Sequence, residues 1–314
     1  MNRRQFITKS PQVLAAVLLA LQPIGCDRKP QSELERVLLT DFMKFSYDSY
    51  STKAGIENIL YDISEINDEG DTKTNGRATH LGDNFFLTAY HVVAEGTSNL
   101  RLIPQRRRGY LFDFRQGFEI VAYDEKSDLA LLKTSDRDNK GKARLHLDSK
   151  IPPPDDNISA FIRLTGSPSK ERYELNYGGR DFYDESIEIA NLGKLVLPAQ
   201  SLLFEKQGRV LKYDEGYLNQ VSGSHRGTSE NELFTSVASY NGESGQPMFV
   251  KVGDDKYVFV GILTGAYGIK HSIPTPNHPL RYKAIQQTGT FFAHRNPIEE
   301  LVKRYLEKIS SAQN

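Results

Sequence analysis

The stretch that decides how this chain folds and works is Asn241-Gly242-Glu243-Ser244-Gly245-Gln246-Pro247. A serine that has glycine two positions before it and directly after it can present its hydroxyl and nearby backbone N–H groups together, because glycine adopts backbone angles that other residues avoid. Gly, Asn and Ser also dominate ordinary β-turns. The stretch therefore supports two hypotheses, a nucleophile loop and a plain turn.

Short runs rich in aromatic and β-branched residues predict β-strands on both sides of a linker. The linker is marked by the charged segment 136–142 and by Pro152-Pro153-Pro154-Asp155-Asp156, which cannot sustain a strand ladder. The predicted strands are 74–81, 84–90, 99–104, 110–114, 118–123 and 129–134 before the linker, and 158–164, 173–177, 186–197, 218–221, 234–237, 247–252 and 257–264 after it.

An amphipathic helix is predicted at each end of this all-β region. Ser32 and Glu35 fit a capping box, and 298–309 carries one apolar stripe at helical spacing. The predicted organisation is a signal in 1–26, a tether and lead-in helix in 27–60, a first β domain in 61–150, a second β domain in 151–295 and a carboxyl-terminal helix in 296–314.

The composition is that of a globular protein without a dominant charge. The 40 basic residues balance the 40 acidic ones, so no overall field favours nucleic acid, and we expect no nucleic-acid partner. The run Arg106-Arg107-Arg108 is interpreted as a solvated loop. Cys26 is the single cysteine, which excludes an intramolecular disulfide.

The first 26 residues have the layout of an export signal. Basic residues precede an apolar run, 13–21, which is too short to cross a bilayer. The segment 2–9 resembles a twin-arginine signal, since Arg3 and Arg4 are followed by Phe6 and Ile7.

Cys26 follows the apolar run, and its position resembles that of the acylated cysteine of bacterial lipoproteins. This resemblance implies membrane attachment through a lipid anchor at Cys26. Asp27 resembles the signal that keeps lipoproteins in the inner membrane, which implies the periplasm or cell envelope as the location. Pro23-Ile24-Gly25 departs from the usual lipoprotein pattern, so cleavage without lipidation stays an alternative.

A nucleophilic serine needs a base and a group that orients the base. Among the histidines, His91 ends the apolar strand Phe85-Phe86-Leu87-Thr88-Ala89-Tyr90, where the chain turns towards an exposed loop. Among the aspartates, Asp128 stands at the head of the apolar strand 129–132. Each of these residues alone is compatible with a purely structural role. The candidate set is His91, Asp128 and Ser244, in that order along the chain.

The three segments together resemble the signature segments of the trypsin/chymotrypsin-like serine proteases. They are Thr88-Ala89-Tyr90-His91-Val92-Val93, Ser127-Asp128-Leu129-Ala130-Leu131-Leu132 and Gly242-Glu243-Ser244-Gly245-Gln246-Pro247. The bacterial periplasmic high-temperature-requirement proteases are the most similar subgroup, and no separate peptide-binding module is apparent. The resemblance covers about residues 75–265 and implies two six-stranded antiparallel β-barrels with the site between them.

The resemblance also implies a mechanism. His91 takes the proton of Ser244, Asp128 orients the imidazole, and the N–H groups of Gly242 and Ser244 form the oxyanion hole. The chain would then be a serine endopeptidase that acts on protein or peptide substrates through an acyl-enzyme, without cofactor or metal. The residues that would line the substrate pocket are Ala238, Thr264, Gly265 and Ala266, which favour a small or apolar side chain at the cleaved position.

Three departures from the family pattern leave an alternative open. The family has Asp or Asn where this chain has Glu243, Gly where it has Gln246, and a small residue where it has Tyr90. The alternative is an inactive protease fold that serves as a membrane-anchored protein-binding module. An α/β-hydrolase is disfavoured, because its elbow needs glycine where Gln246 stands. A metallohydrolase is disfavoured because the sequence has no His-Glu-x-x-His.

Overall fold

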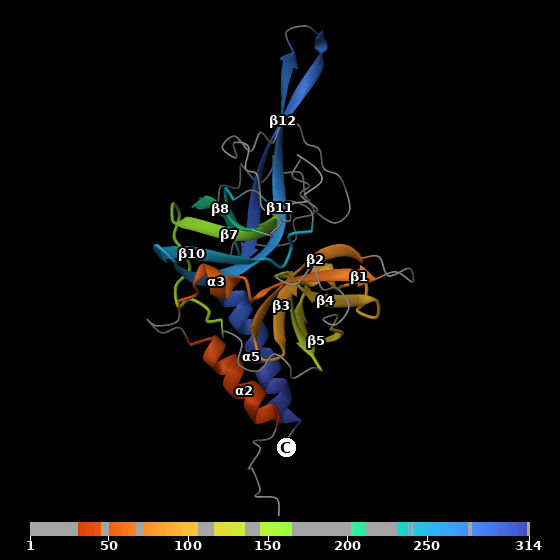
Figure 1. Cartoon of the computed structure of the whole chain (residues 1–314), viewed down its shortest axis with the longest axis vertical. Coiled ribbons are helices and arrows are strands. Elements are labelled where there is room, and N and C mark those ends of the chain that lie inside the picture. Colours follow the sequence, from red (N-terminus) through yellow and green to blue (C-terminus); the bar gives the residue numbers. More distant parts are fainter. Residues whose placement is uncertain are drawn as a thin grey trace, which may run out of the picture. The chain divides into compact units, whose positions relative to one another are not determined.

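The computed structural model describes residues 31–44, 50–66, 72–105, 116–135, 145–164, 202–211, 231–237, 239, 242–275 and 278–312, and Figure 1 shows the arrangement of their helices and strands. The chain divides into two compact units, residues 1–37 and 38–314, and the strands all belong to the second. No helix within the described ranges is both long and apolar enough to cross a membrane. Cys26 and the rest of the predicted signal lie outside the described residues.

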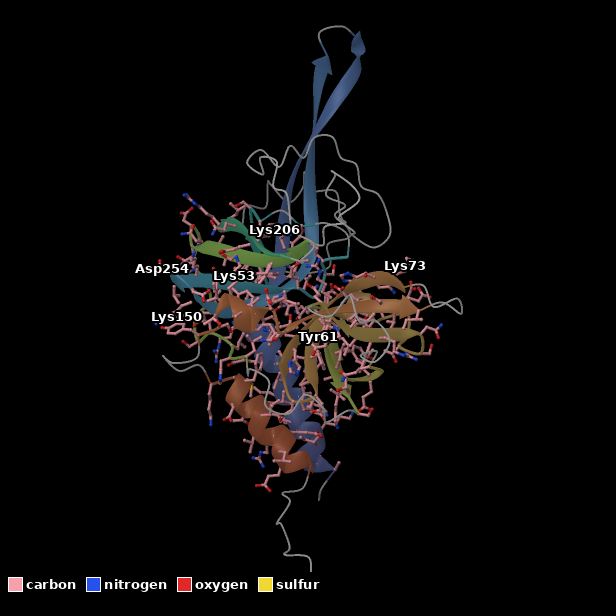
Figure 2. The ribbon with its side chains drawn as sticks, viewed as in Figure 1. Lys53, Tyr61, Lys73, Lys150, Lys206 and Asp254 are labelled. Carbon is pink, nitrogen blue, oxygen red and sulfur yellow. The ribbon has the colours of Figure 1, made fainter. Side chains whose placement is uncertain are left out.

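The first β region is a six-stranded antiparallel sheet with strand order β4-β1-β2-β3-β6-β5. Its two edges approach each other, because Leu102 on β4 and Gln116 ahead of β5 exchange backbone hydrogen bonds of 2.9 and 3.2 Å. Tyr61 packs edge-on against Phe86 inside this sheet, whereas Lys73 is exposed (Figure 2). The strands are β1 Leu60–Ile66, β2 Thr72–Gly82, β3 Phe85–Ala89, β4 Leu100–Pro104, β5 Phe118–Asp124 and β6 Leu129–Thr134.

The second β region is a closed barrel of six strands in the order β10-β11-β12-β9-β8-β7. Its longest pair runs antiparallel from Ile262 opposite Ala293 to Thr275 opposite His278. The strands are β7 Asn157–Leu164, β8 Leu202–Leu211, β9 Glu232–Thr235, β10 Pro247–Gly253, β11 Lys256–Thr275 and β12 His278–Ala293. The all-β class with two six-stranded antiparallel units is therefore confirmed, although the first unit joins its edges by one bridge rather than by a continuous ladder.

The two helices that the apolar periodicity predicts are present as α2 Gln31–Phe42 and α5 Arg295–Ser311. The short helix α3 Lys53–Ile56 and the single 3₁₀ turn η1 Tyr90–Val92 were not predicted. The His294 ring caps α5 by accepting a hydrogen bond from the Asn296 N–H at 3.2 Å. Leu301, Val302 and Tyr305 of this helix share one buried cluster with side chains of both β regions, among them Phe85 and Phe259. This cluster joins the two β regions through a common apolar core.

Three strands were not among the predicted runs. β1 and β8 were missed, and β11 continues to Thr275 and is followed by β12, where the sequence interpretation left little room for further structure. The predicted strands 110–114, 173–177, 186–197 and 218–221 lie outside the described residues. The predicted domain boundaries stay predictions.

Candidate active site

His91 and Asp128 meet at the end of the first sheet. β3 ends at Ala89 and η1 turns the chain, so that His91 Nδ1 lies 2.6 Å from Asp128 Oδ2. The other carboxylate oxygen, Oδ1, accepts the His91 backbone N–H at 2.8 Å. A carboxylate on Nδ1 favours the tautomer that carries its proton there, which leaves Nε2 as the basic nitrogen.

The backbone of Asp128 is shaped to make these two contacts. Asp128 has φ of 51°, a left-handed conformation that Asp tolerates better than most residues. Its carbonyl accepts the Tyr90 N–H at 2.9 Å, while its side chain holds His91. One residue therefore fixes both the backbone and the imidazole of the turn. The His91 side chain keeps 52% of its surface exposed, so the imidazole is accessible from solution.

The loop that carries Ser244 depends on two glycines in left-handed conformations. Gly242 has φ of 88° and Gly245 has φ of 90°. A Cβ at Gly245 would lie 1.9 Å from the Arg77 carbonyl oxygen, so only glycine fits there. The Gln246 N–H donates to the Glu243 carbonyl at 3.0 Å and closes the turn around Ser244. The stretch is therefore a turn, as the plain interpretation has it, but one packed tightly against the first sheet.

Backbone hydrogen bonds hold this loop from both β regions. The Arg77 N–H on β2 donates to the Ser244 carbonyl at 2.7 Å. On the other side, the Gly245 N–H donates to the Leu263 carbonyl at 2.7 Å, and the Leu263 N–H donates to the Gln246 carbonyl at 2.9 Å. Among the backbone hydrogen bonds of the described residues, none is donated by Gly242 or Ser244. These are the two N–H groups that the resemblance assigns to an oxyanion hole.

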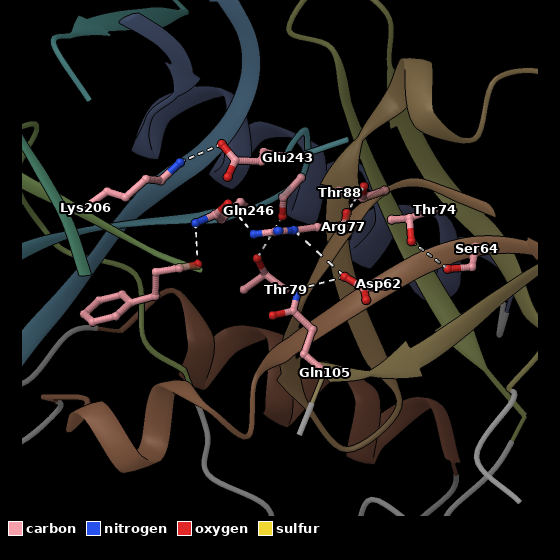
Figure 3. Close-up of polar contacts among 12 residues, drawn as sticks. Asp62, Ser64, Thr74, Arg77, Thr79, Thr88, Gln105, Lys206, Glu243 and Gln246 are labelled. Atoms are coloured by element: carbon pink, nitrogen blue, oxygen red, sulfur yellow. Dashed lines mark hydrogen bonds and ion pairs between the residues drawn. The ribbon is translucent and has the colours of Figure 1, made fainter. Parts of the chain in front are cut away.

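Glu243 and Gln246, the two departures within this loop, are both fully buried. Figure 3 shows Lys206 of β8 directed at Glu243, with Nζ 2.6 Å from Oε2. Burial lowers the pKa of Lys206, and the charge and hydrogen bond of Glu243 oppose this effect. The Gln246 amide accepts from Arg77 Nη1 at 2.7 Å and donates to the Phe161 carbonyl at 2.5 Å. Both polar side chains therefore have the hydrogen-bonding partners that buried polar groups require.

A buried polar network under the loop starts at Arg77 (Figure 3). The Arg77 guanidinium lies 3.9 Å from Asp62 of β1, and Asp62 also accepts from the Gln105 amide at 2.8 Å. The Thr79 hydroxyl donates to the Gly245 carbonyl at 3.1 Å. The first sheet therefore binds the loop through hydrogen bonds from both the backbone and the side chains of β2.

The predicted pocket residues are only partly described. Thr264 is buried on β11, directly after the residue that pairs with the loop, and its hydroxyl donates to Glu232 Oε1 at 2.6 Å. Gly265 follows on the same strand, and Ala266 is described by its backbone alone. Ala238 lies outside the described residues. In the described part of the chain, no group of three or more His, Cys, Asp or Glu could hold a metal ion.

Three charged residues of the site were missed by the sequence interpretation. Arg77, Lys206 and Glu232 all lie on strands. Arg77 contacts Gln246 across the two β regions, whereas Lys206 and Glu232 contact Glu243 and Thr264 within the second region. The available signal was a charged residue within a buried strand. Such a residue indicates a partner of opposite charge or a hydrogen-bonding group, because a buried charge is costly without one. Finding that partner requires the strand register, which the sequence patterns do not supply.

No protein-family model matches the chain, and no curated protein sequence is significantly similar to it. Among solved structures, it is similar to the Rv3671c protease from M. tuberculosis in its active form, with 13% identity and a TM-score of 0.46 over 80% of this chain and 82% of that one. An inactive form of Rv3671c protease has 11% identity and a TM-score of 0.44 over 80% of this chain and 91% of that one. The MamO protease domain from Magnetospirillum magneticum gives 15% identity and a TM-score of 0.43 over 78% and 96%.

Proposed function

We propose that this chain is a serine endopeptidase in which Ser244 attacks a peptide carbonyl. The observation that carries the proposal is the two-point contact of Asp128 with His91, at the end of the same sheet that holds the Ser244 loop through Arg77. A carboxylate that fixes a half-exposed imidazole through Nδ1 is the arrangement that activates a serine hydroxyl.

The proposed reaction uses groups of this chain only. His91 Nε2 accepts the Ser244 proton as Oγ bonds to the substrate carbonyl carbon, and Asp128 supports the resulting imidazolium. The N–H groups of Gly242 and Ser244 stabilise the oxyanion. His91 then protonates the leaving amine, and water cleaves the acyl-enzyme by the same route.

The contacts of Glu243 and Gln246 favour an active enzyme over an inactive binding module. These are two of the three departures that gave the binding alternative its support, and each of the two side chains is buried and hydrogen-bonded beneath the turn. The turn keeps the left-handed glycines on both sides of Ser244. For the substrate we propose a small or apolar side chain at the cleaved position, which rests on Ala238.

Labelling with a fluorophosphonate probe tests this proposal, because the probe modifies an activated serine. We expect the native chain to gain one probe mass at Ser244, and Ser244→Ala to lose both labelling and peptide hydrolysis by a factor on the order of 10⁴ or more. Ser149→Ala, which removes an exposed serine, is the matched control and should keep full labelling. A native chain that stays unlabelled while folded would overturn the proposal and favour the binding module.

We also propose that the chain is exported to the periplasm or cell envelope, most similar in role to the high-temperature-requirement proteases, and lipid-anchored at Cys26. The basic start, the short apolar run and the single cysteine after it support this location. Mass analysis of the mature amino terminus tests it. A terminus that begins at an acylated Cys26 is the expected result, and a terminus without acyl mass would exclude the anchor.

A further inference from the structure

Arg77 of β2 contacts three successive residues of the Ser244 loop. Its N–H donates to the Ser244 carbonyl at 2.7 Å, and its carbonyl oxygen packs so closely against Gly245 that a Cβ has no room there. Its guanidinium donates through Nη1 to Gln246 Oε1 at 2.7 Å. Both side chains are buried, Arg77 with 7% of its surface exposed and Gln246 with 0%. The backbone and the side chain of one residue therefore hold the loop together.

Arg77 is also bonded to the strand that leads to the candidate base. The Thr88 hydroxyl of β3 donates to the Arg77 carbonyl at 2.6 Å, and Thr88 lies three positions before His91. β3 ends at Ala89, so His91 follows directly from the segment that Thr88 fixes. The position of the imidazole is thus related to that of the Ser244 loop through hydrogen bonds on both sides of Arg77.

Gln246 extends these contacts into the second β region. Its amide nitrogen donates to the Phe161 carbonyl of β7 at 2.5 Å, while its amide oxygen accepts from Arg77. A guanidinium only donates and a carbonyl only accepts, so the two partners fix the orientation of the amide. Figure 3 shows Arg77 between Gln246 and Asp62, whose carboxylate lies 3.9 Å from the guanidinium. We call this series of contacts, from Asp62 of β1 to Phe161 of β7, the Arg77–Gln246 link.

The link depends on a residue that departs from the family pattern. That pattern has glycine at position 246, and glycine has no side chain with which to make either contact. The side chains of Asp62, Arg77 and Gln246 are all buried, and a buried polar group that loses its partner is left without hydration. Moving the loop away from either β region would break one of these hydrogen bonds. The link therefore opposes displacement of the loop relative to both regions.

We propose that Arg77 and Gln246 are positioning residues, which hold Ser244 within reach of His91 by linking the two β regions beneath the loop. This inference rests on the serine endopeptidase proposed above. A nucleophile and its base have to lie within hydrogen-bond distance, and a displacement of about 1 Å can lower the rate about 100-fold. The link affects the chemical step rather than substrate binding, because both side chains are buried beneath the loop.

Gln246→Met removes the link, because methionine has nearly the same length as glutamine and makes neither hydrogen bond. We expect kcat for peptide hydrolysis to fall by about 10- to 100-fold, with KM within about twofold of the native value. Gln246→Glu keeps the acceptor for Arg77 and loses the donor to Phe161. It should lose nearly as much kcat, because the link then no longer reaches β7. Full kcat in either variant would overturn the link.

Gln105→Met is the matched control for a loss of stability. Gln105 is also a buried glutamine, and its amide donates to Asp62 at 2.8 Å, a contact within the first β region. We expect this variant to lower the free energy of unfolding and to keep kcat. A fall in kcat equal to that of Gln246→Met would show that general loosening of the network, rather than the link between the regions, is responsible.

A thiol at the position of the serine hydroxyl tests the link without peptide hydrolysis. A thiol beside an imidazolium has a pKa below its ordinary value of about 8.5. In the Ser244→Cys chain, alkylation by iodoacetamide is followed against pH by peptide mass, so that Cys26 is counted separately. We expect a lowered thiol pKa, and we expect Gln246→Met to raise it by about one unit or more.

Three results of this titration would overturn the link. They are an ordinary thiol pKa in the Ser244→Cys chain itself, a lowered pKa that Gln246→Met leaves unchanged, and a rise that Gln105→Met reproduces. The endopeptidase is tested separately, because a folded native chain that fluorophosphonate leaves unlabelled would overturn it whatever the thiol shows.

Discussion

At the scale of single residues, the candidate site depends on backbone conformations that few residue types adopt. Asp128 and Gly245 both have positive φ, and both make contacts that join the turn or loop to the first sheet. Asp128 thus needs both its carboxylate and a positive φ, and Gly245 needs both the absence of a Cβ and a positive φ. Substitutions that remove one of the two properties and keep the other show which of them matters.

Asp128→Asn keeps the left-handed backbone, because Asn tolerates it, and removes the charge that supports the imidazolium. We expect kcat for peptide hydrolysis to fall by a factor on the order of 10⁴, with little change in KM. Asp83→Asn is the control, since Asp83 also has positive φ, 44°, in the turn between β2 and β3. Steady-state kinetics of both variants give the answer, and equal losses would show that the loss does not arise from the contact of the Asp128 charge with His91.

Gly245→Ala tests the close approach of the loop to β2. The new Cβ would overlap the Arg77 carbonyl oxygen at 1.9 Å, so the loop has to move and both stability and labelling are expected to fall. Gly96→Ala is the control, since Gly96 has φ of 116° but no heavy atom within 4 Å of a Cβ there. It should lose only the cost of the unfavourable φ, about 1 kcal/mol. Denaturant unfolding and probe labelling of the two variants make the comparison.

At the scale of elements, β8 supports the Ser244 loop through one buried ion pair. Lys206 reaches Glu243 at 2.6 Å, and the two side chains are 9% and 0% exposed. Buried charges gain stability only as a pair, and each alone carries the cost of its lost hydration. The loss of either Lys206 or Glu243 is therefore expected to destabilise both the Ser244 loop and β8, because the remaining charge is left buried without its partner.

A double-mutant cycle measures this coupling. We expect Lys206→Met or Glu243→Gln alone to cost about 3–5 kcal/mol of unfolding free energy, and the double variant to cost less than the sum of the two. Kinetics of the double variant report whether the loop keeps its shape without the charges. Additive losses in the cycle would contradict the ion pair.

The elements that the sequence predicts best are those whose pattern matches their burial. β3, Phe85–Ala89, is buried throughout and reads as one apolar run, and α5 shows a clean helical stripe. β1 was missed because Asp62 and Ser64 are polar yet 2% exposed. Asp62 contacts Arg77 of β2 and Gln105, which directly follows β4, and Ser64 contacts Thr74 of β2. A strand whose polar residues are buried through long-range hydrogen bonds cannot be recognised from a local sequence pattern.

The same limit applies to the site. His91, Asp128 and Ser244 were selected because each stands next to a strand or glycine pattern that can be read locally. The contact between His91 and Asp128 follows from β3 and β6 being neighbours, which pairs Ala89 with Leu129. For Lys206, Arg77 and Glu232 the local signal, a charge within a strand, does not identify a partner, since their roles depend on the register between strands far apart in the sequence.

At the scale of the whole molecule, Glu232 should give stability a dependence on pH. Its pKa is raised from 4.5 to about 7, so the native state keeps a proton that the unfolded chain has already lost. Stability from this residue is present below about pH 4.5 and is lost as the pH rises through about 7, by on the order of 3 kcal/mol. Glu232→Gln should remove this slope in unfolding measurements across that range.

Glu205 supplies a control with the opposite sign. Burial opposes the shift, but hydrogen bonds from Ser159, Gln207 and Tyr257 lower its pKa below 4.5. Its contribution is therefore present above about pH 4.5 and is lost as the pH falls. Glu205→Gln should flatten the acid side of the stability curve and leave the neutral side unchanged. A neutral slope that survives Glu232→Gln would contradict the assignment to Glu232.

The contacts of β2 with the Ser244 loop determine at which stage of folding the proposed nucleophile can be assembled. Thr79 and Gly245, which make one of these contacts, are 166 positions apart in the chain. Contacts that span so much sequence form late, because they close a large loop. A nascent or half-folded copy of this chain thus carries its serine in an unassembled loop. The proposed peptidase therefore cannot cleave its own unfinished copies until both β regions have come together.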